Sequence, residues 1–433
     1  MKSQNVKKII SILPLFIKKG LLMLYENYTT WKMLRTLGYT NKQALRKITE
    51  KIRYTDTKNR KINILVYKLS GLTFGGTEKF LQVIAKHLSK EKFNVHLMYS
   101  EKAMGGQKND GRKYYLEGSI SSFIDCTYTS IDGFYPYAVR DLKPDINSLL
   151  EQNKIDLIIT AGSGYSEFPI NMIRNTPIIM VNIFGSPSAQ RNIVKNICIS
   201  NEVSEKVSKM VGPEKNKVSY ILSERPDLES DKNGLEIRKR FSINDDEFVF
   251  GRIGRPDDGI FDPIGINAFK GIIRDYPKVH YIIMSPPPIL RKIVDHEKIP
   301  NVHFLDPSSH EKDIWAFHKS IDALAHFRLD GESFGLNIAE SMLSGKPIIT
   351  HKSAIWNAHL EYLLPSFSRI AEKDSVDQYY IFMKEMIEKK KSGEIIKMGI
   401  ESKQQADNLF LAENNIKNIE EWIEESIHTK NIG

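Results

Sequence analysis

The sequence predicts an α/β protein with two domains, each built on a parallel sheet with helices packed against it. A chain of 433 residues is longer than one hydrophobic core usually organises. Short, nearly continuous apolar runs alternate with helical patterns, as expected for strands buried on both faces. A polar stretch at 223–245, with Pro226 and Gly234, separates two sets of such runs. These observations indicate two α/β domains joined by a linker.

The first set begins with a βαβ unit, which implies parallel pairing. A predicted strand at 62–67 is followed by a glycine-containing loop, a helical pattern and a strand at 93–99. Further strands of this set are expected at 155–160, 177–183, 196–200 and 217–222. The second set has expected strands at 248–253, 279–284, 302–305, 321–327 and 347–350. A polar helix with an apolar stripe is expected at the C-terminus.

These patterns divide the chain into five parts. We expect a basic amphipathic N-terminal extension, an N-terminal α/β domain, a linker with an entry helix, a C-terminal α/β domain and a C-terminal helix, at residues 1–60, 61–225, 226–245, 246–410 and 411–433. Two such domains form a cleft, and ligands of open α/β sheets bind beyond the carboxyl ends of the strands. The loops that follow strands are therefore where chemistry is expected.

Positive charge is concentrated in residues 1–60, which hold fourteen Lys/Arg and three Asp/Glu, whereas the whole chain is +9. The apolar runs between residues 9 and 25 are too short to span a bilayer, and Lys18 and Lys19 interrupt them. One interpretation is a segment that lies in an anionic membrane interface. Its inserted side chains would be Leu15, Phe16, Leu21, Leu22 and Leu24. The other interpretation is a leader that packs on the body of the protein.

The nearly neutral body argues against a nucleic-acid partner, because it offers no path for a phosphate backbone. Cys126 and Cys198 lie in apolar runs and are expected to be small buried hydrophobic residues in a reducing compartment. They form no CxxC or Cys/His cluster, so no zinc site is expected.

The segment 330–347 is the most informative in the chain. It follows a predicted strand, and a helix is expected to start near Phe334 with Ser333 as N-cap and to stop at Gly345. Glu332 then lies in the loop before the helix, and Glu340 lies two turns into it.

This arrangement suits a ligand with a diphosphate between two hydroxyl-bearing groups. Unpaired amides of Phe334, Gly335 and Leu336 at a helix start would favour a phosphate. Carboxylates on either side, from Glu332 and Glu340, would accept hydrogen bonds from hydroxyls. A nucleoside-diphosphate sugar is such a ligand. The alternative is an amphipathic helix with two surface glutamates.

The segment resembles the Glu-x7-Glu motif of retaining GT-B glycosyltransferases, specifically family 4, the glycosyl transferases group 1. The resemblance implies two Rossmann-like domains that face a cleft, the first for the acceptor and the second for the donor. It implies a C-terminal helix that crosses back to the N-domain. It also implies that Glu340 holds the ribose hydroxyls of the donor and that Glu332 contacts its sugar.

Two further stretches resemble the same family. Gly75-Gly76, after the first strand, are similar to its N-terminal glycine loop, although a glycine pair is often only a turn. Residues 251–256 resemble the loop that carries a phosphate-binding arginine. Arg255 is our first choice for the diphosphate and Arg252 our second, because a guanidinium makes bidentate phosphate contacts. The lysine that the family places shortly afterwards is absent.

A histidine near the donor sugar is also absent from the matching stretch, 180–186. Asn182 or Ser186 could hydrogen-bond the sugar there, and His326 is a candidate substitute, although one histidine on a buried strand is more often structural.

The resemblance implies a retaining hexosyl-type transferase that needs no protein nucleophile, cofactor or essential metal. Its expected partners are a nucleotide-sugar donor and a saccharide or lipid-linked acceptor, in polysaccharide or glycoconjugate synthesis. The expected location is the cytoplasm, either free or peripheral on the inner face of a membrane. The alternative is a catalytically weakened subunit that binds a nucleotide sugar or stabilises a partner.

Overall fold

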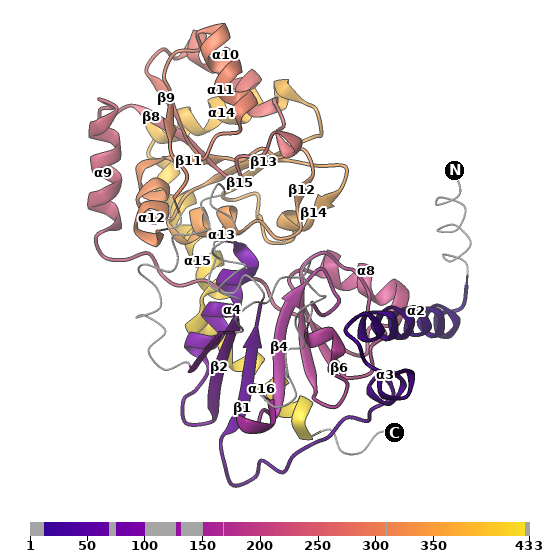
Figure 1. The fold of residues 1–433 in the computed structure, drawn as a ribbon. Coiled ribbons are helices and arrows are strands. Elements are labelled where there is room, and N and C mark those ends of the chain that lie inside the picture. The colour runs from indigo at the N-terminus through magenta and orange to yellow at the C-terminus, as the bar shows by residue number, and fades with distance from the viewer. Residues whose placement is uncertain are drawn as a thin grey trace. The chain divides into compact units, whose positions relative to one another are not determined.

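The computed structural model contains two compact α/β units (Figure 1). Unit 1 comprises residues 1–222 and 415–433, and unit 2 comprises residues 223–414. The structure describes residues 13–68, 75–99, 127–130, 150–167, 169–308 and 310–428. Cys126 and residues 69–74 of the first glycine loop lie outside this part of the chain, whereas Cys198 is buried as expected.

Unit 1 is built on a parallel sheet with the strand order β3-β2-β1-β4-β5-β6-β7. Both β4 and β5 are buried throughout, as expected for strands covered on both faces. Sequence patterns predicted β1 and β2 to the residue and β4 to β7 with different boundaries. They missed β3, whose sequence Thr-Tyr-Thr-Ser lacks an apolar run. The strands are β1 (Ile62–Tyr67), β2 (Phe93–Tyr99), β3 (Thr127–Ser130), β4 (Leu157–Gly162), β5 (Ile178–Asn182), β6 (Ile193–Cys198) and β7 (Asn216–Val218).

The last helix of the chain belongs to unit 1, as the resemblance implied. The Ser89 amide donates a hydrogen bond of 2.7 Å to the Glu420 side chain of this helix. Lys92 forms an ion pair with Glu424, also on this helix, at 3.0 Å. Its apolar stripe, which includes Ile419 and Ile423, is fully buried. The helical elements of unit 1 that follow β1 are α4 (Gly76–His87), η3 (Ile170–Met172), α8 (Asn201–Val211) and α16 (Ala412–His428).

The N-terminal extension is integrated into unit 1 and forms two helices, α2 (Leu15–Thr36) and α3 (Asn41–Ile48). A small core joins Leu34, Leu37 and Ala44 of the extension to Met172. The interpretation as a leader that packs on the body is therefore correct for the inner side of these helices. No helix in the described part of the chain is long and apolar enough to cross a membrane.

Unit 2 contains a second parallel sheet, with the order β10-β9-β8-β11-β13-β15, and a small two-stranded sheet of β12 and β14. The strand β15 was not predicted, because its sequence Ser-Arg-Ile-Ala is short and half polar. The strands are β8 (Phe248–Ile253), β9 (Val279–Met284), β10 (Val302–Leu305), β11 (Ala323–Ala325), β12 (Gly331–Glu332), β13 (Ile348–His351), β14 (Trp356–Asn357) and β15 (Ser368–Ala371).

Helices cover both faces of this sheet (Figure 1). The expected entry helix is α9, which packs on α12 where Gly234 approaches Lys319 so closely that an added Cβ would lie 2.8 Å from its side chain. The helices are α9 (Ser230–Arg240), η4 (Asp258–Ile260), α10 (Ile264–Asp275), α11 (Pro288–Glu297), α12 (Glu311–Ser320), α13 (Leu336–Leu343), η5 (Ala358–Glu361), α14 (Val376–Lys391) and α15 (Glu394–Phe410).

Candidate donor site

The strand order of unit 2 places a switch point between β8 and β11. β9 and β10 lie on one side of β8, and β11, β13 and β15 lie on the other. Ligands of open parallel sheets bind at such a point, beyond the carboxyl ends of the strands. Arg252 lies near the end of β8, and His326, Phe327 and Arg328 directly follow β11. The loop with Glu332 comes next, so several of the predicted residues meet at this edge.

The helix after that loop starts later than predicted. α13 begins at Leu336, and its N-cap is Gly335 rather than Ser333. Gly335 has φ +93°, a left-handed conformation that glycine adopts without strain. The hydroxyl of buried Tyr362 donates to the Phe334 carbonyl and fixes this turn.

The phosphate-binding amides expected from α13 therefore shift by two positions along the chain. The amides of Ile338 and Ala339 donate to the Gly335 carbonyl. Those of Leu336 and Asn337 precede these bonds, at the positions where helices leave N–H groups unpaired. The Asn337 side chain donates to the Ile253 carbonyl at 3.1 Å and ties the helix start to the end of β8. As predicted, Gly345 ends the helix, with φ +73°.

Glu332 is held in place by charge. Its Oε1 lies 3.3 Å from Nε2 of His326, and its Oε2 lies 3.3 Å from a guanidinium nitrogen of Arg328. Burial raises the pKa of this carboxyl, but contact with His326 and the charge of Arg328 outweigh burial and lower it to about 2. Glu332 is thus a fixed anion and hydrogen-bond acceptor at neutral pH.

His326 serves as a structural partner of Glu332. The side chain is buried, and its Nε2 faces the Glu332 carboxylate. Burial lowers its pKa and outweighs the contact with Glu332, which raises it; the nearby charge of Arg252 adds a smaller lowering effect. His359 lies in the same cluster, with its ring 6.5 Å from that of His326, and burial lowers its pKa to about 4. Sequence patterns could not place His359 there, because it lies in η5, a separate turn.

Glu340 is buried in α13 and is only 2% exposed. One carboxylate oxygen lies 3.6 Å from Nε2 of His318, and the other ring nitrogen of His318 lies 2.7 Å from the Ser341 hydroxyl. The carboxylate is thereby fixed by α12.

Arg252 is the buried cation of this edge. Its side chain is 1% exposed and stacks over the Phe327 ring at 5.1 Å. Within the described chain, its Nε and Nη1 atoms have no hydrogen-bond partner. Burial lowers its pKa to about 10, so the group stays charged at neutral pH. A buried cation with unused donors is destabilising on its own.

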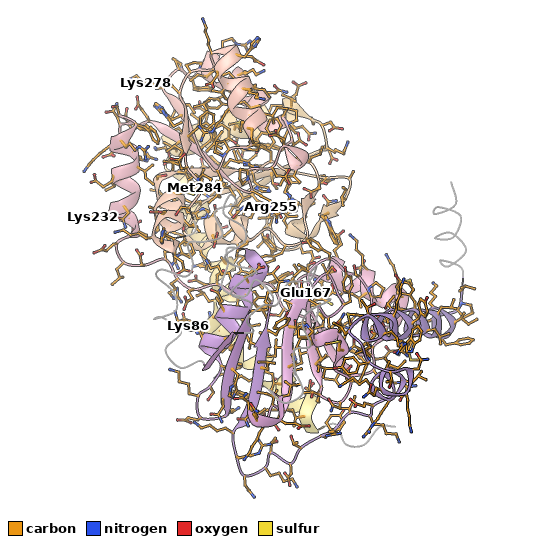
Figure 2. All side chains as sticks on the ribbon, viewed as in Figure 1. Lys86, Glu167, Lys232, Arg255, Lys278 and Met284 are labelled. Carbon is orange, nitrogen blue, oxygen red and sulfur yellow. The ribbon has the colours of Figure 1, made fainter. Side chains whose placement is uncertain are left out.

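The two candidate arginines differ in burial. Arg255, our first choice, is exposed on the loop after β8 (Figure 2). Arg252, our second choice, is buried and has two donor atoms without a partner in the described chain. Lys270, the next lysine along the chain, lies on α10 and pairs with Glu297 at 2.5 Å.

The candidate residues of unit 1 have different outcomes. Asn182 is fully buried, and its amide donates to the Ser186 carbonyl at 2.9 Å and accepts from the Gly185 amide at 2.8 Å. It therefore holds its own loop together and does not face a ligand. Gly75 is the N-cap of α4, and Gly76 is its first residue, so this pair lies at the start of a helix.

An ion pair that the sequence analysis missed lies at the corresponding switch point of unit 1. Lys68 follows β1, and Glu167, labelled in Figure 2, follows β4. The two side chains meet at 2.6 Å, and Lys68 also donates to the Ala161 carbonyl at 3.2 Å. Strand order could have revealed the pair, because β1 and β4 are neighbours and both residues come just after strand ends.

Comparison with known proteins agrees with this geometry. Residues 264–358, which include Glu332 and Glu340, match the family model described as glycosyl transferases group 1. Comparison with curated proteins finds no match. No group of side chains that could hold a metal ion is found in the described part of the chain.

Solved structures match nearly the whole chain. A glycosyltransferase from Rickettsia africae has 12% identity and a TM-score of 0.64, and the match covers 86% of this chain and 100% of that one. HepE of Anabaena, solved with UDP and glucose, has 16% identity and a TM-score of 0.62, with 84% and 100% covered. Sucrose-phosphate synthase of Thermosynechococcus elongatus has 12% identity and a TM-score of 0.63, with 84% and 99% covered.

These findings confirm the resemblance that the Glu332–Glu340 segment indicated. The chain has the GT-B fold of two Rossmann-like units, and its second unit contains a group 1 glycosyltransferase segment. They support sugar transfer as the class of reaction.

Proposed function

We propose that this protein transfers a sugar from a nucleoside-diphosphate donor to an acceptor hydroxyl with retention of anomeric configuration. The observation that carries the proposal is the Arg252 guanidinium, buried at the switch point with two unused donor atoms. A cation kept there at a cost to stability favours an anionic ligand as its missing partner. A diphosphate beside Arg252 would also lie close to the start of α13.

The main electrostatic demand of this reaction is the charge on the departing diphosphate. Arg252 would meet it from a buried, low-dielectric position, together with the amides of Leu336 and Asn337. Preorganised contacts of this kind are each worth ~2.7–4 kcal/mol in measured enzymes. Glu332, ionised and fixed, would accept a hydrogen bond from a hydroxyl of the donor sugar. The proposal requires no protein nucleophile, no cofactor and no essential metal.

A uridine nucleotide is the first donor to test, because the similar Anabaena structures were solved with UDP and UDP-glucose. Glu340 would hold the ribose, since its carboxylate on α13 is held in place by His318. We place the acceptor, a saccharide or a lipid-linked saccharide, at the carboxyl edge of unit 1 near Lys68 and Glu167. Glu167 is part-exposed and retains acceptor capacity for a hydroxyl. Two cysteines without a disulfide framework suit the cytoplasm as the site of the reaction.

A second candidate function is a subunit that binds the donor without transferring its sugar. It is favoured by the loop after β8, where Asp257 and Asp258 stand in the region in which the family places a lysine. Loss of one of two cations would weaken stabilisation of the leaving group more than it weakens ground-state binding.

Nucleotide release distinguishes the two functions. The purified protein is incubated with a panel of nucleotide sugars, with and without acceptor glycans, and free nucleotide is measured. We expect one donor to be consumed, and we expect Arg252→Met to slow its release by about a hundredfold or more. Lys270→Met is the matched control, because that lysine is paired elsewhere in unit 2. Donor binding without release would support the second function instead.

A further inference from the structure

The outward side of α2 is an apolar surface that the sugar-transfer function does not use. The inner side of the helix is occupied, with Thr30 and Leu34 buried against unit 1. The outer side nevertheless carries large apolar and aromatic side chains. The most exposed of these are Phe16 (76%), Tyr25 (66%), Leu24 (64%), Tyr28 (58%) and Leu21 (50%).

Helical spacing gathers most of these side chains into one stripe. Leu21, Leu24 and Tyr28 are separated by three and four residues, so they lie along one face of α2. The same spacing continues to Lys32 and Arg35, both exposed. The stripe is therefore apolar in the first half of the helix and basic near its end. Leu22, which the sequence analysis assigned to the inserting set, is part-buried and lies outside this stripe.

The acid of α2 is turned away from the stripe. Glu26 is the one acidic residue between Leu15 and Thr36, among four basic residues. Its carboxylate accepts a hydrogen bond of 2.9 Å from the Ala189 amide of unit 1. The outward stripe thus combines apolar, aromatic and cationic groups without a compensating acid.

We infer that this stripe, defined by Leu21, Leu24, Tyr25, Tyr28 and Lys32, binds the surface of an anionic lipid bilayer. Leucines would enter the boundary of the acyl chains, and tyrosine rings suit the headgroup level, where one end is apolar and the other is wet. The cations would lie among anionic headgroups, which attract basic residues. One apolar side of α2 is already buried, so covering the other side would remove further apolar surface from water, which is favourable. This inference goes beyond the proposed function and does not depend on it.

Vesicle sedimentation of the full chain tests the inference. Phosphatidylcholine vesicles containing one third phosphatidylglycerol are compared with vesicles of phosphatidylcholine alone. We expect the wild-type protein to sediment with the anionic vesicles, less at high salt, and hardly with the neutral ones. Lys32→Gln should lower the partition coefficient about fivefold at low salt. Leu21→Gln with Leu24→Gln should lower it on the order of tenfold or more at every salt concentration.

The matched control is Ile396→Gln with Ile400→Gln on α15. These two isoleucines are also exposed and four residues apart, at 69% and 54%. Their replacement should leave sedimentation unchanged, and circular dichroism should show that both double variants remain folded. Equal sedimentation of the α2 variant and the wild type would overturn the inference. So would light scattering that shows a dimer abolished by the α2 substitutions, because the stripe would then cover a second copy of the chain.

Discussion

Replacing Arg252 with methionine should weaken nucleotide binding without a loss of stability. The side chain is buried, and two of its nitrogen atoms lack partners within the described chain. Methionine has a similar length and can keep the contact with Phe327. Replacement of buried ionic groups by apolar ones is neutral or stabilising by ~1–4 kcal/mol in measured cases. We therefore expect an unchanged or higher free energy of unfolding.

Binding should change in the opposite direction. One hydrogen bond to a charged group contributes ~1.5–3 kcal/mol, which corresponds to roughly a ten- to hundredfold loss of affinity. The loss should appear for UDP and be absent for uridine, because Arg252 would act on phosphates. Calorimetry with both ligands, beside urea unfolding of both proteins, measures each part. A variant that loses stability and binds UDP normally would show that Arg252 is structural and refute the reasoning.

The remaining predictions concern other parts of the two units. Arg255→Ala should reduce UDP affinity less than Arg252→Met does, since Arg255 is exposed; a larger effect by calorimetry would restore our first choice. Glu340→Gln should weaken nucleotide binding by ~1.5–3 kcal/mol, and unchanged affinity would remove its assigned role. Glu332 has a pKa lowered from 4.5 to about 2, so its stabilising effect is complete above pH 4.5 and is lost as the pH falls toward 2. Urea unfolding should therefore show a larger cost of Glu332→Gln at pH 7 than at pH 3, and equal costs would contradict this assignment. Removal of residues 1–60 should lower the melting temperature of unit 1, because that segment shares a core with Met172.

The fold was largely predictable because buried parallel strands have a strong local signature. β1, β8 and β9 were predicted to the residue, since each is an apolar run bounded by polar or turn-forming residues. β3 and β15 were missed because their sequences are polar or mixed and their pairing depends on neighbours distant in the chain.

The site was only partly predictable. Glu332 and Glu340 lie before and within α13, as their spacing of eight residues predicted, and their roles toward a ligand stay a prediction. Arg252 and Arg255 differ in burial. The sequence does not show this difference, because the two residues lie only three positions apart near the end of a strand. Lys68 and Glu167 meet because β1 pairs with β4, which is distant in the chain. The N-cap of α13 is Gly335 instead of Ser333 because Tyr362 holds the preceding turn.

A crystal structure with a bound nucleoside diphosphate would show directly whether Arg252 and α13 hold the donor. We predict diphosphate oxygens within hydrogen-bond distance of Arg252 and of the first amides of α13, with the ribose hydroxyls beside Glu340. A nucleotide bound away from the switch point between β8 and β11, with the donors of Arg252 still unused, would contradict it.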